Sequence, residues 1–305
     1  MVDVSGVLKL VPTRDSIVAA LDGLPAAQGA ISPFVPGETV GAAVPVVEDV
    51  ILAGMSASVA YLPDTDSTAS ARLVHMATID ALDSAHVAEG SDLLVDLAAL
   101  GLSRGVDREQ VAADLTALCG AAEQVGMTVT VAGVAHEHLD AALAVHCAVA
   151  AEHPDLGMTV SASLLRSEAD CGDLARRGSR VRLVRQETAE PEGLAFINAH
   201  EIDKAYVRCT RLLMAMDSRI VVATHDPQLI EIASALAVRS DRDPPGFSFQ
   251  FRLGVRPEAA AELVSTGARV GILVPFGPDW ATYVSTRIAL RPNSVFQAAR
   301  AALGR

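Results

Sequence analysis

The amino-acid sequence predicts a single α/β domain, a (β/α)8 barrel with an N-terminal helical lead-in and a last helix over the barrel mouth. The chain has 305 residues, half of them apolar, which suffices for the roughly 250 residues of such a barrel. Eight short apolar runs alternate with longer helical patterns, which implies parallel strands joined by right-handed crossovers and closed into a barrel. An open, doubly wound sheet is the alternative, but neither a G-x-G-x-x-G after the first strand nor a P-loop occurs.

The lead-in is expected at residues 1–54 and the barrel at 55–305. The lead-in holds a weak helical pattern at 17–24, a Pro- and Gly-bearing stretch at 31–39 and a second helical run at 40–53. Strands are expected at 57–62, 93–97, 127–131, 158–162, 180–184, 219–223, 247–250 and 270–274. Each strand precedes a helix, expected at 67–87, 108–125, 137–152, 167–177, 199–216, 227–239, 257–266 and 279–290.

Composition and charge limit the classes of partner. A net charge of −13 with 24 basic residues and no Lys/Arg cluster argues against nucleic acid and leaves at most peripheral membrane contact. The N-terminus lacks a basic n-region, and no run of 18 uninterrupted apolar residues occurs, so we expect a cytoplasmic protein.

Cysteine and histidine positions give no metal-site pattern. The four cysteines lack C-x-x-C or Cys/His ligand spacing, and we expect buried free thiols. His136 and His138 flank Glu137 and do not share a helix face. A solvated helix start explains them better than a metal ion, and no metal is expected.

The stretch 268–291 reads as a buried strand, a Pro/Gly break and a helix. In that helix Tyr283, Arg287 and Arg291 are spaced i, i+4, i+8 and share one face. Such a helix could close over a pocket at the C-terminal ends of the strands, where barrels carry their active sites. The same rule selects as candidates Asp96, Ala132, Ser161, Ser163, Arg182, Arg185, Thr224, His225, Asp226, Gln250 and Pro275.

These strand-end residues have structural as well as functional interpretations. Arg182 and Arg185 suit an anionic ligand, and the alternative for either is a salt bridge to a neighbouring loop. Asp226 precedes a proline and is expected to cap the next helix. For His225 a structural and a functional role are about equally favoured.

Six segments carry a family resemblance. They are Phe34–Thr39, Arg182-Leu-Val, Asp203-Lys-Ala-Tyr-Val-Arg-Cys, Ala223-Thr-His-Asp-Pro227, Phe247–Pro257 and Val274–Trp280 with Tyr283 and Arg287. In this order they resemble the monofunctional bacterial proline dehydrogenases over nearly the whole chain. The resemblance implies an FAD-containing barrel that oxidises L-proline to 1-pyrroline-5-carboxylate in proline catabolism, by hydride transfer to the flavin, with a quinone as electron acceptor.

The resemblance also implies roles for single residues. Arg182 matches an arginine beside the flavin, and Arg287 matches one of two adjacent arginines that grip the proline carboxylate; both are expected to be catalytic. Thr224 and His225 match the segment near the phosphates and adenine of the cofactor. The cofactor-binding set implied in this way is Arg182, Val184, Arg185, Thr224, His225 and Gln250.

The chain departs from the family pattern in the substrate pocket. Thr286 replaces the first of the two arginines, Leu290 a glutamate one turn later, Leu273 a tyrosine and Asp96 a lysine. Losing one donor of a buried charged clamp costs roughly 2–5 kcal/mol. The altered pocket is expected to comprise Asp96, Leu273, Tyr283, Thr286 and Leu290. Further departures are Ala132, Ser161 and the run Arg185-Gln-Glu-Thr188.

Three functional hypotheses follow. The first is a flavoenzyme of the proline dehydrogenase family, acting on proline or an analogue. The second is a catalytically degenerate homologue that has lost proline turnover or the flavin and binds a ligand or partner. The third is a barrel enzyme of another class, such as an aldolase or isomerase, and it is the weakest because no lysine ends a barrel strand.

Overall fold

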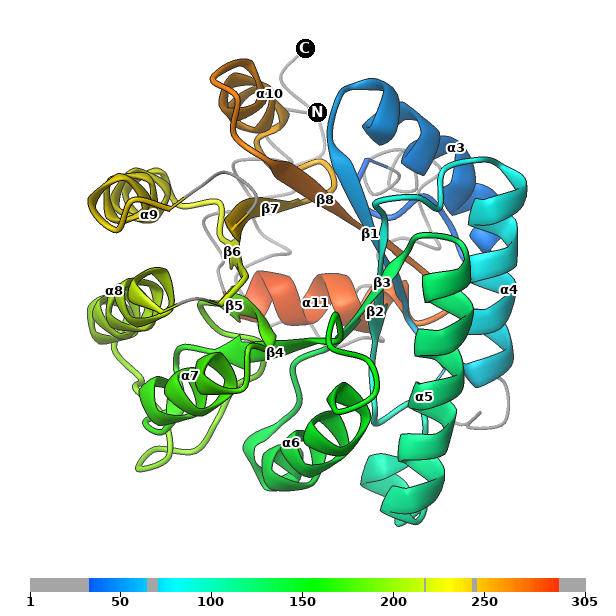
Figure 1. The fold of residues 1–305 in the computed structure, drawn as a ribbon, viewed down its shortest axis with the longest axis horizontal. Helices are drawn as coiled ribbons and strands as arrows, with labels where there is room; N and C mark the ends of the chain where they lie inside the picture. The colour runs from blue at the N-terminus through cyan, green and yellow to red at the C-terminus, as the bar shows by residue number, and fades with distance from the viewer. Residues whose placement is uncertain (1–32, 65–70, 217, 243–245, 291–305) are drawn as a thin grey trace, which may run out of the picture.

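Eight parallel strands form a closed barrel in the part of the chain that the computed structural model describes, residues 33–64, 71–216, 218–242 and 246–290. Each strand pairs with its successor in sequence, and the last pairs with the first (Figure 1). The predicted (β/α)8 barrel is therefore confirmed, and the alternative of an open sheet is wrong. The expected helical pattern at 17–24 lies outside the described residues.

The elements lie where the sequence predicted them. The strands are β1 (Ser56–Tyr61), β2 (Asp92–Val95), β3 (Thr128–Val131), β4 (Gly157–Ser161), β5 (Arg180–Val184), β6 (Ile220–Ala223), β7 (Phe247–Arg252) and β8 (Val270–Phe276). The helices are α3 (Val40–Leu52), α4 (Ala71–Ser84), α5 (Arg108–Gln124), α6 (His136–Ala150), α7 (Ser167–Arg176), α8 (Ala199–Ala215), α9 (Pro227–Arg239), α10 (Pro257–Ser265) and α11 (Trp280–Leu290), with a short 3₁₀ turn, η2 (Leu102–Arg104). A buried apolar core joins the strands to the surrounding helices.

A polar network at the N-terminal ends of the strands, here called the floor network, links β1, β2, β3 and β5 inside the barrel. The Asp92 carboxylate accepts hydrogen bonds from Thr128 Oγ1 at 2.7 Å and from Thr130 Oγ1 at 2.9 Å. Ser58 Oγ donates to the same carboxylate at 3.2 Å, and Arg180 Nη2 donates at 2.6 Å. A buried carboxylate with this many donors is well compensated for its desolvation.

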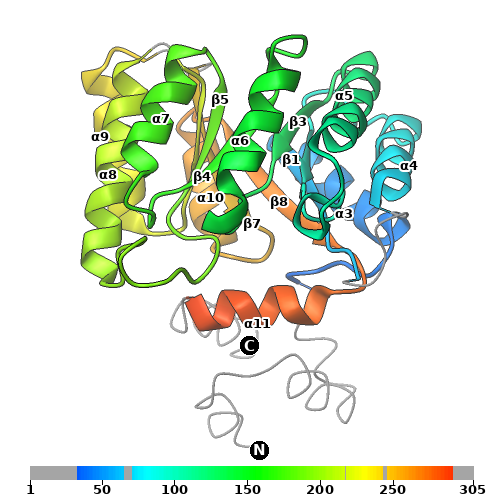
Figure 2. The ribbon, with the colours of Figure 1, turned by 90° about the horizontal axis from the view of Figure 1, so that it is seen from below.

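The helix after β8 leaves the outer ring. α11 runs across one end of the barrel, while α3 packs outside against β8, β1 and α4 (Figure 2). Because α11 lies over the mouth, α3 takes the ring position between β8 and β1. This confirms the predicted last helix over the barrel mouth.

A glycine makes the turn from β8 into α11 possible. Gly277 has φ 135°, and a Cβ there would lie 2.3 Å from the Leu62 carbonyl oxygen. Its N–H donates to the Gly37 carbonyl at 3.1 Å. Only glycine fits such a close backbone approach, so this turn ties the lid helix to the segment before α3.

Within the residues that the structure describes, no helix combines the length and the apolarity needed to span a bilayer. The cysteines are free thiols; Cys119, Cys171 and Cys209 are buried and Cys147 is half-buried. This agrees with the expectation of unpaired, mostly buried cysteines.

Candidate functional site

Arg182 stands inside the barrel beneath the mouth. Side chains alternate between the two faces of a strand, so Arg182 and Val184 of β5 face inward while Leu183 faces the helices. The guanidinium donates from Nε to Gln250 Oε1 at 2.6 Å and from Nη1 to Thr159 Oγ1 at 3.5 Å. Only 4% of Arg182 is exposed. Burial lowers the pKa of Arg182, although the charge of Glu187 opposes that shift.

Gln250 connects this arginine to the floor network. Its Nε2 donates to Ser58 Oγ at 2.9 Å, and Ser58 in turn donates to Asp92. Gln250 is 5% exposed. Because Gln250 binds on both sides, the orientation of the Arg182 guanidinium is fixed before any ligand arrives, which is the preorganisation that charge-stabilising sites require.

Arg287 of the lid helix is held by Glu187 in the loop after β5. The Arg287 guanidinium donates to the Glu187 carboxylate and, at 3.2 Å, to the Glu187 main-chain carbonyl. The second carboxylate oxygen of Glu187 lies 3.9 Å from Arg182 Nη1. Glu187 therefore bridges the lid and the barrel interior.

The electrostatics of this bridge follow from its burial and its neighbours. Burial alone would raise the pKa of Glu187, but Arg287, Arg182 and Arg252 together bring it below its usual value. Burial also works against the charge of Arg287, yet Glu187 leaves the pKa of that guanidinium raised. The carboxylate and the guanidinium are both charged at neutral pH.

Arg252 brings a third cation to the mouth. It lies two residues after Gln250 on β7 and pairs in register with Leu273 of β8, so both face inward. Burial, and then the charge of Arg287, lower the pKa of Arg252 to about 10. Its main-chain N–H donates to His225 Nε2 at 2.7 Å, which leaves the proton of a neutral imidazole on Nδ1.

Two residues predicted for the altered substrate pocket, Tyr283 and Leu273, lie beside these arginines. The Tyr283 ring lies under the Arg287 guanidinium, 5.3 Å from its centre, a cation–π contact. Leu273 is buried on β8, and Thr286 is half-buried on α11. The Leu290 side chain lies outside the described part of the chain, as does Arg291.

Asp96, just after β2, belongs to the same region. Burial, the largest influence, and the negative charge of Glu187 raise the pKa of Asp96, whereas a hydrogen bond from the Ala98 N–H at 2.8 Å opposes the shift. The two acids of the mouth thus act on each other electrostatically.

Other candidates have structural partners. Arg185 binds Asp203 and the Ala199 carbonyl at the start of α8, so its guanidinium lies against that helix, in the kind of ion pair that was the alternative to ligand binding. Asp226 accepts from the first N–H groups of α9, which confirms the predicted cap. Thr224 Oγ1 accepts from the Asp226 N–H at 3.2 Å.

His136 is less solvated than its sequence context suggested. Its ring Nδ1 lies 2.6 Å from Glu190 Oε2, and its N–H donates to Glu190 Oε1. His136 begins α6 as predicted and its side chain remains partly exposed, and the loop after β5 folds back so that Glu190 pairs with its ring. In the described ranges no cluster of three or more His, Cys, Asp or Glu forms a metal site.

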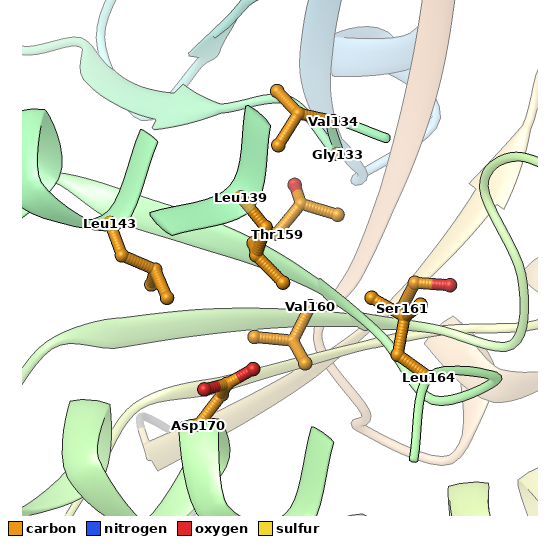
Figure 3. Close-up of a pocket in the computed structure, with 9 residues that line it drawn as sticks. All are labelled: Gly133, Val134, Leu139, Leu143, Thr159, Val160, Ser161, Leu164 and Asp170. Atoms are coloured by element: carbon orange, nitrogen blue, oxygen red, sulfur yellow. The ribbon is translucent and has the colours of Figure 1, made fainter. Parts of the chain in front are cut away.

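A small cavity lies beneath the loops after β3 and β4 (Figure 3). Its lining is mostly apolar and contains no cation: Gly133, Val134, Leu139, Leu143, Thr159, Val160, Ser161, Leu164 and Asp170. The Asp170 carboxylate in its wall is engaged by Arg166. This cavity lacks convergent polar groups for a ligand, so the mouth is the better candidate.

Cations outnumber acids at the mouth. Arg182, Arg252 and Arg287 face Glu187, and no carboxylate of the described residues forms an ion pair with Arg252. Glu187 Oε2 and Arg287 Nε are buried without a hydrogen-bond partner in the described structure. Such a region can receive an anionic ligand that also offers hydrogen-bonding groups. A dinucleotide cofactor with a diphosphate fits this donor set.

Sequence reasoning missed Glu187 and Arg252 as members of the site. Arg252 shares the inward parity of Gln250, and that spacing could have identified it. The contact of Glu187 with Arg287 joins residues 100 positions apart. No local pattern signals such a pairing.

The fold and the mouth define a (β/α)8-barrel protein with an arginine-lined site under a lid helix. Residues 52–282 match the family model described as proline dehydrogenase. The chain belongs to the proline dehydrogenase family, a family of oxidoreductases. The alternative of a degenerate homologue finds no support in these comparisons.

Relatives of known name agree with the family assignment. The chain is 29% identical over 268 residues to proline dehydrogenase 1 of Bacillus subtilis strain 168, covering 86% of this chain and 87% of the relative. It is 29% identical over 144 residues to proline dehydrogenase of Deinococcus radiodurans, covering 47% and 46% of the two chains.

Solved structures share the fold. Proline utilization A (PutA) from Bdellovibrio bacteriovorus, inactivated by N-propargylglycine, superposes with a TM-score of 0.79 at 17% identity, covering 93% of this chain and 36% of that one. A D778Y mutant of PutA from Bradyrhizobium japonicum gives 0.71 at 20% identity, covering 92% and 34%. The chain thus spans about a third of the length of these larger proteins.

Proposed function

We propose that the protein is an FAD-dependent oxidoreductase that converts L-proline, or a close analogue, to the corresponding cyclic imine. The observation that carries the proposal is the placement of Arg182, a buried cation whose guanidinium is fixed by Gln250 directly beneath the mouth. Family membership supports the reaction class. The fold alone would not, because barrels host many chemistries.

Arg182, Val184, Thr224, His225 and Gln250 are the proposed cofactor contacts, all at the C-terminal half of the barrel. Bound FAD would supply the hydride acceptor. Arg182 and Arg252 place positive charge where an electron-rich ligand is stabilised. Arg185 enters this proposal only through its ion pair with Asp203, which positions the loop after β5.

Arg287 is the proposed partner of the substrate carboxylate, with Tyr283 supporting its guanidinium from below. Leu273 offers an apolar wall for the pyrrolidine ring of the substrate, and Thr286 offers a small polar one. Closure of α11 over the substrate would exclude water from the reacting centre. A quinone is the proposed electron acceptor, by analogy with the family.

Anaerobic reduction tests the reaction. The full-length protein is incubated with FAD, freed of excess cofactor and titrated with L-proline in a sealed cuvette. Loss of the flavin absorbance bands is the expected result, with D-proline as the control for a specific site. Persistence of the oxidised spectrum at saturating L-proline would sink the assignment of proline as reductant.

A further inference from the structure

The lid arginine already binds a carboxylate of the chain. Glu187 accepts from both terminal nitrogens of Arg287, one through its carboxylate and one through its main-chain carbonyl. Both side chains are largely buried, with 16% of the Arg287 side chain and 15% of the Glu187 side chain exposed. One terminal nitrogen of Arg287 thus already binds a carboxylate, the group that arginine side chains commonly bind in proteins.

The surrounding structure is shaped to hold Glu187 in this position. The Glu187 N–H donates to Ser161 Oγ at 3.3 Å, and Ser161 Oγ is 2.9 Å from Ser163 Oγ. Gly133 leaves room for the side chain, since a Cβ there would lie 2.7 Å from Glu187 Cγ. The end of β4 and the loop after β3 therefore both accommodate this acid.

We propose that Glu187 is a specificity-determining residue that occupies the carboxylate-binding position of Arg287, so that a carboxylate ligand must displace it to bind. Displacing Glu187 reduces the binding free energy of every ligand that binds through a carboxylate, including free proline. This inference rests on the proposed role of Arg287, and it adds that the resting site disfavours monocarboxylates.

Direct binding measurements test this inference without turnover. L-Proline and pyrrolidine, the same ring without a carboxylate, are titrated calorimetrically into the FAD-incubated full-length protein and its Glu187→Gln variant. Removing a close buried competitor should raise proline affinity roughly tenfold or more. Pyrrolidine affinity should stay level, because a ligand without a carboxylate does not compete with Glu187 for Arg287.

Control variants separate a specific effect from a general one. Glu192→Gln removes an exposed acid from the same loop and should leave proline affinity unchanged. In the double variant Glu187→Gln/Arg287→Gln the gain should disappear, because the freed guanidinium is what recruits the ligand. If Glu187→Gln does not fold, Glu187→Asp keeps the charge on a shorter side chain and should give a smaller gain.

Three outcomes are decisive. A gain for proline but not for pyrrolidine supports the inference, even if proline never reduces the flavin, in which case only the proposed reaction fails. Equal proline affinity in the variant and the unaltered protein overturns it, even if proline does reduce the flavin. No measurable proline binding by either protein also overturns it, because the variant must bind. Trp280, at the start of α11, is the one tryptophan of the chain, and its fluorescence gives an independent readout of ligand binding.

Discussion

Arg180 Nη2 at the start of β5 lies 2.6 Å from the Asp92 carboxylate at the start of β2, across the inside of the barrel. The same carboxylate receives the hydroxyl groups of the floor network. Through Ser58 and Gln250 the network reaches Arg182. The charged group at the mouth is thus positioned by a chain of hydrogen bonds that begins at the opposite end of the barrel.

Asp92→Asn should destabilise the fold by about 3–5 kcal/mol, because it leaves the half-buried Arg180 cation without its counter-charge. Urea denaturation followed by circular dichroism measures this loss. Asp155→Asn is the matched control, since it removes the partner of Arg219 in an exposed pair and should change the free energy of unfolding by less than about 1 kcal/mol. Equal effects of the two variants would contradict a structural role for the floor network.

Gln250→Met should cost about 2–3 kcal/mol of stability, because the buried Arg182 Nε loses its acceptor. Urea unfolding is again the measurement. Gln228→Met on the exposed face of α9 should lie within about 0.5 kcal/mol of the unaltered protein. A variant at position 250 as stable as this control would show that the hydrogen bond to Arg182 is dispensable.

His75 should make the protein acid-sensitive. Its ring packs edge-on to Tyr61 at 6.0 Å, and burial lowers its pKa from 6.5 to about 4. The unfolded chain therefore takes up a proton as pH falls through 6.5 while the folded chain does not, so stability decreases between pH 6.5 and 4. For one such group the loss amounts to about 3 kcal/mol.

The variant His75→Leu should show a weaker decrease across that pH window in denaturant unfolding at several pH values. His200→Leu, at an exposed position, serves as the control and should keep the pH dependence of the unaltered protein. An unchanged pH profile in His75→Leu would mean that other groups cause the acid sensitivity.

Gly133→Ala should destabilise the protein by about 1–3 kcal/mol through overpacking against Glu187, whose Cγ would lie 2.7 Å from the new methyl group. In a Glu187→Ala background the same change should cost much less, which a double-mutant cycle in thermal unfolding detects. Gly120→Ala, where no atom lies within 4 Å of a new Cβ, is expected to be neutral or stabilising. Additive effects in the cycle would refute the contact.

The sequence predicted the strands, the following helices and the lid because each depends on local apolar periodicity and on chain breaks such as the Pro/Gly stretch before α11. The Asp226 cap was predictable for the same reason. The position of Arg185 depends on strand parity: three residues after Arg182, it faces outward, and α8 supplies Asp203 as its partner.

The composition of the mouth could be predicted only in part. Arg182, Gln250 and Tyr283 were candidates. In the structure Arg182 binds Gln250, and the Tyr283 ring contacts Arg287. The Glu187–Arg287 pair depends on how the loop after β5 meets a helix that begins after β8, and barrel closure alone brings these together. Arg252 was missed because the strand was expected to end at residue 250, whereas β7 continues to Arg252.

The dissociation constant for FAD, measured by titrating the cofactor into the purified full-length protein and following its fluorescence quenching, tests the central claim most directly. A site with buried arginines fixed beneath the mouth should take up one FAD per chain, and Arg182→Met should weaken that binding by roughly tenfold or more. Failure of the unaltered, folded protein to quench added FAD would contradict the assignment of the mouth as a flavin site.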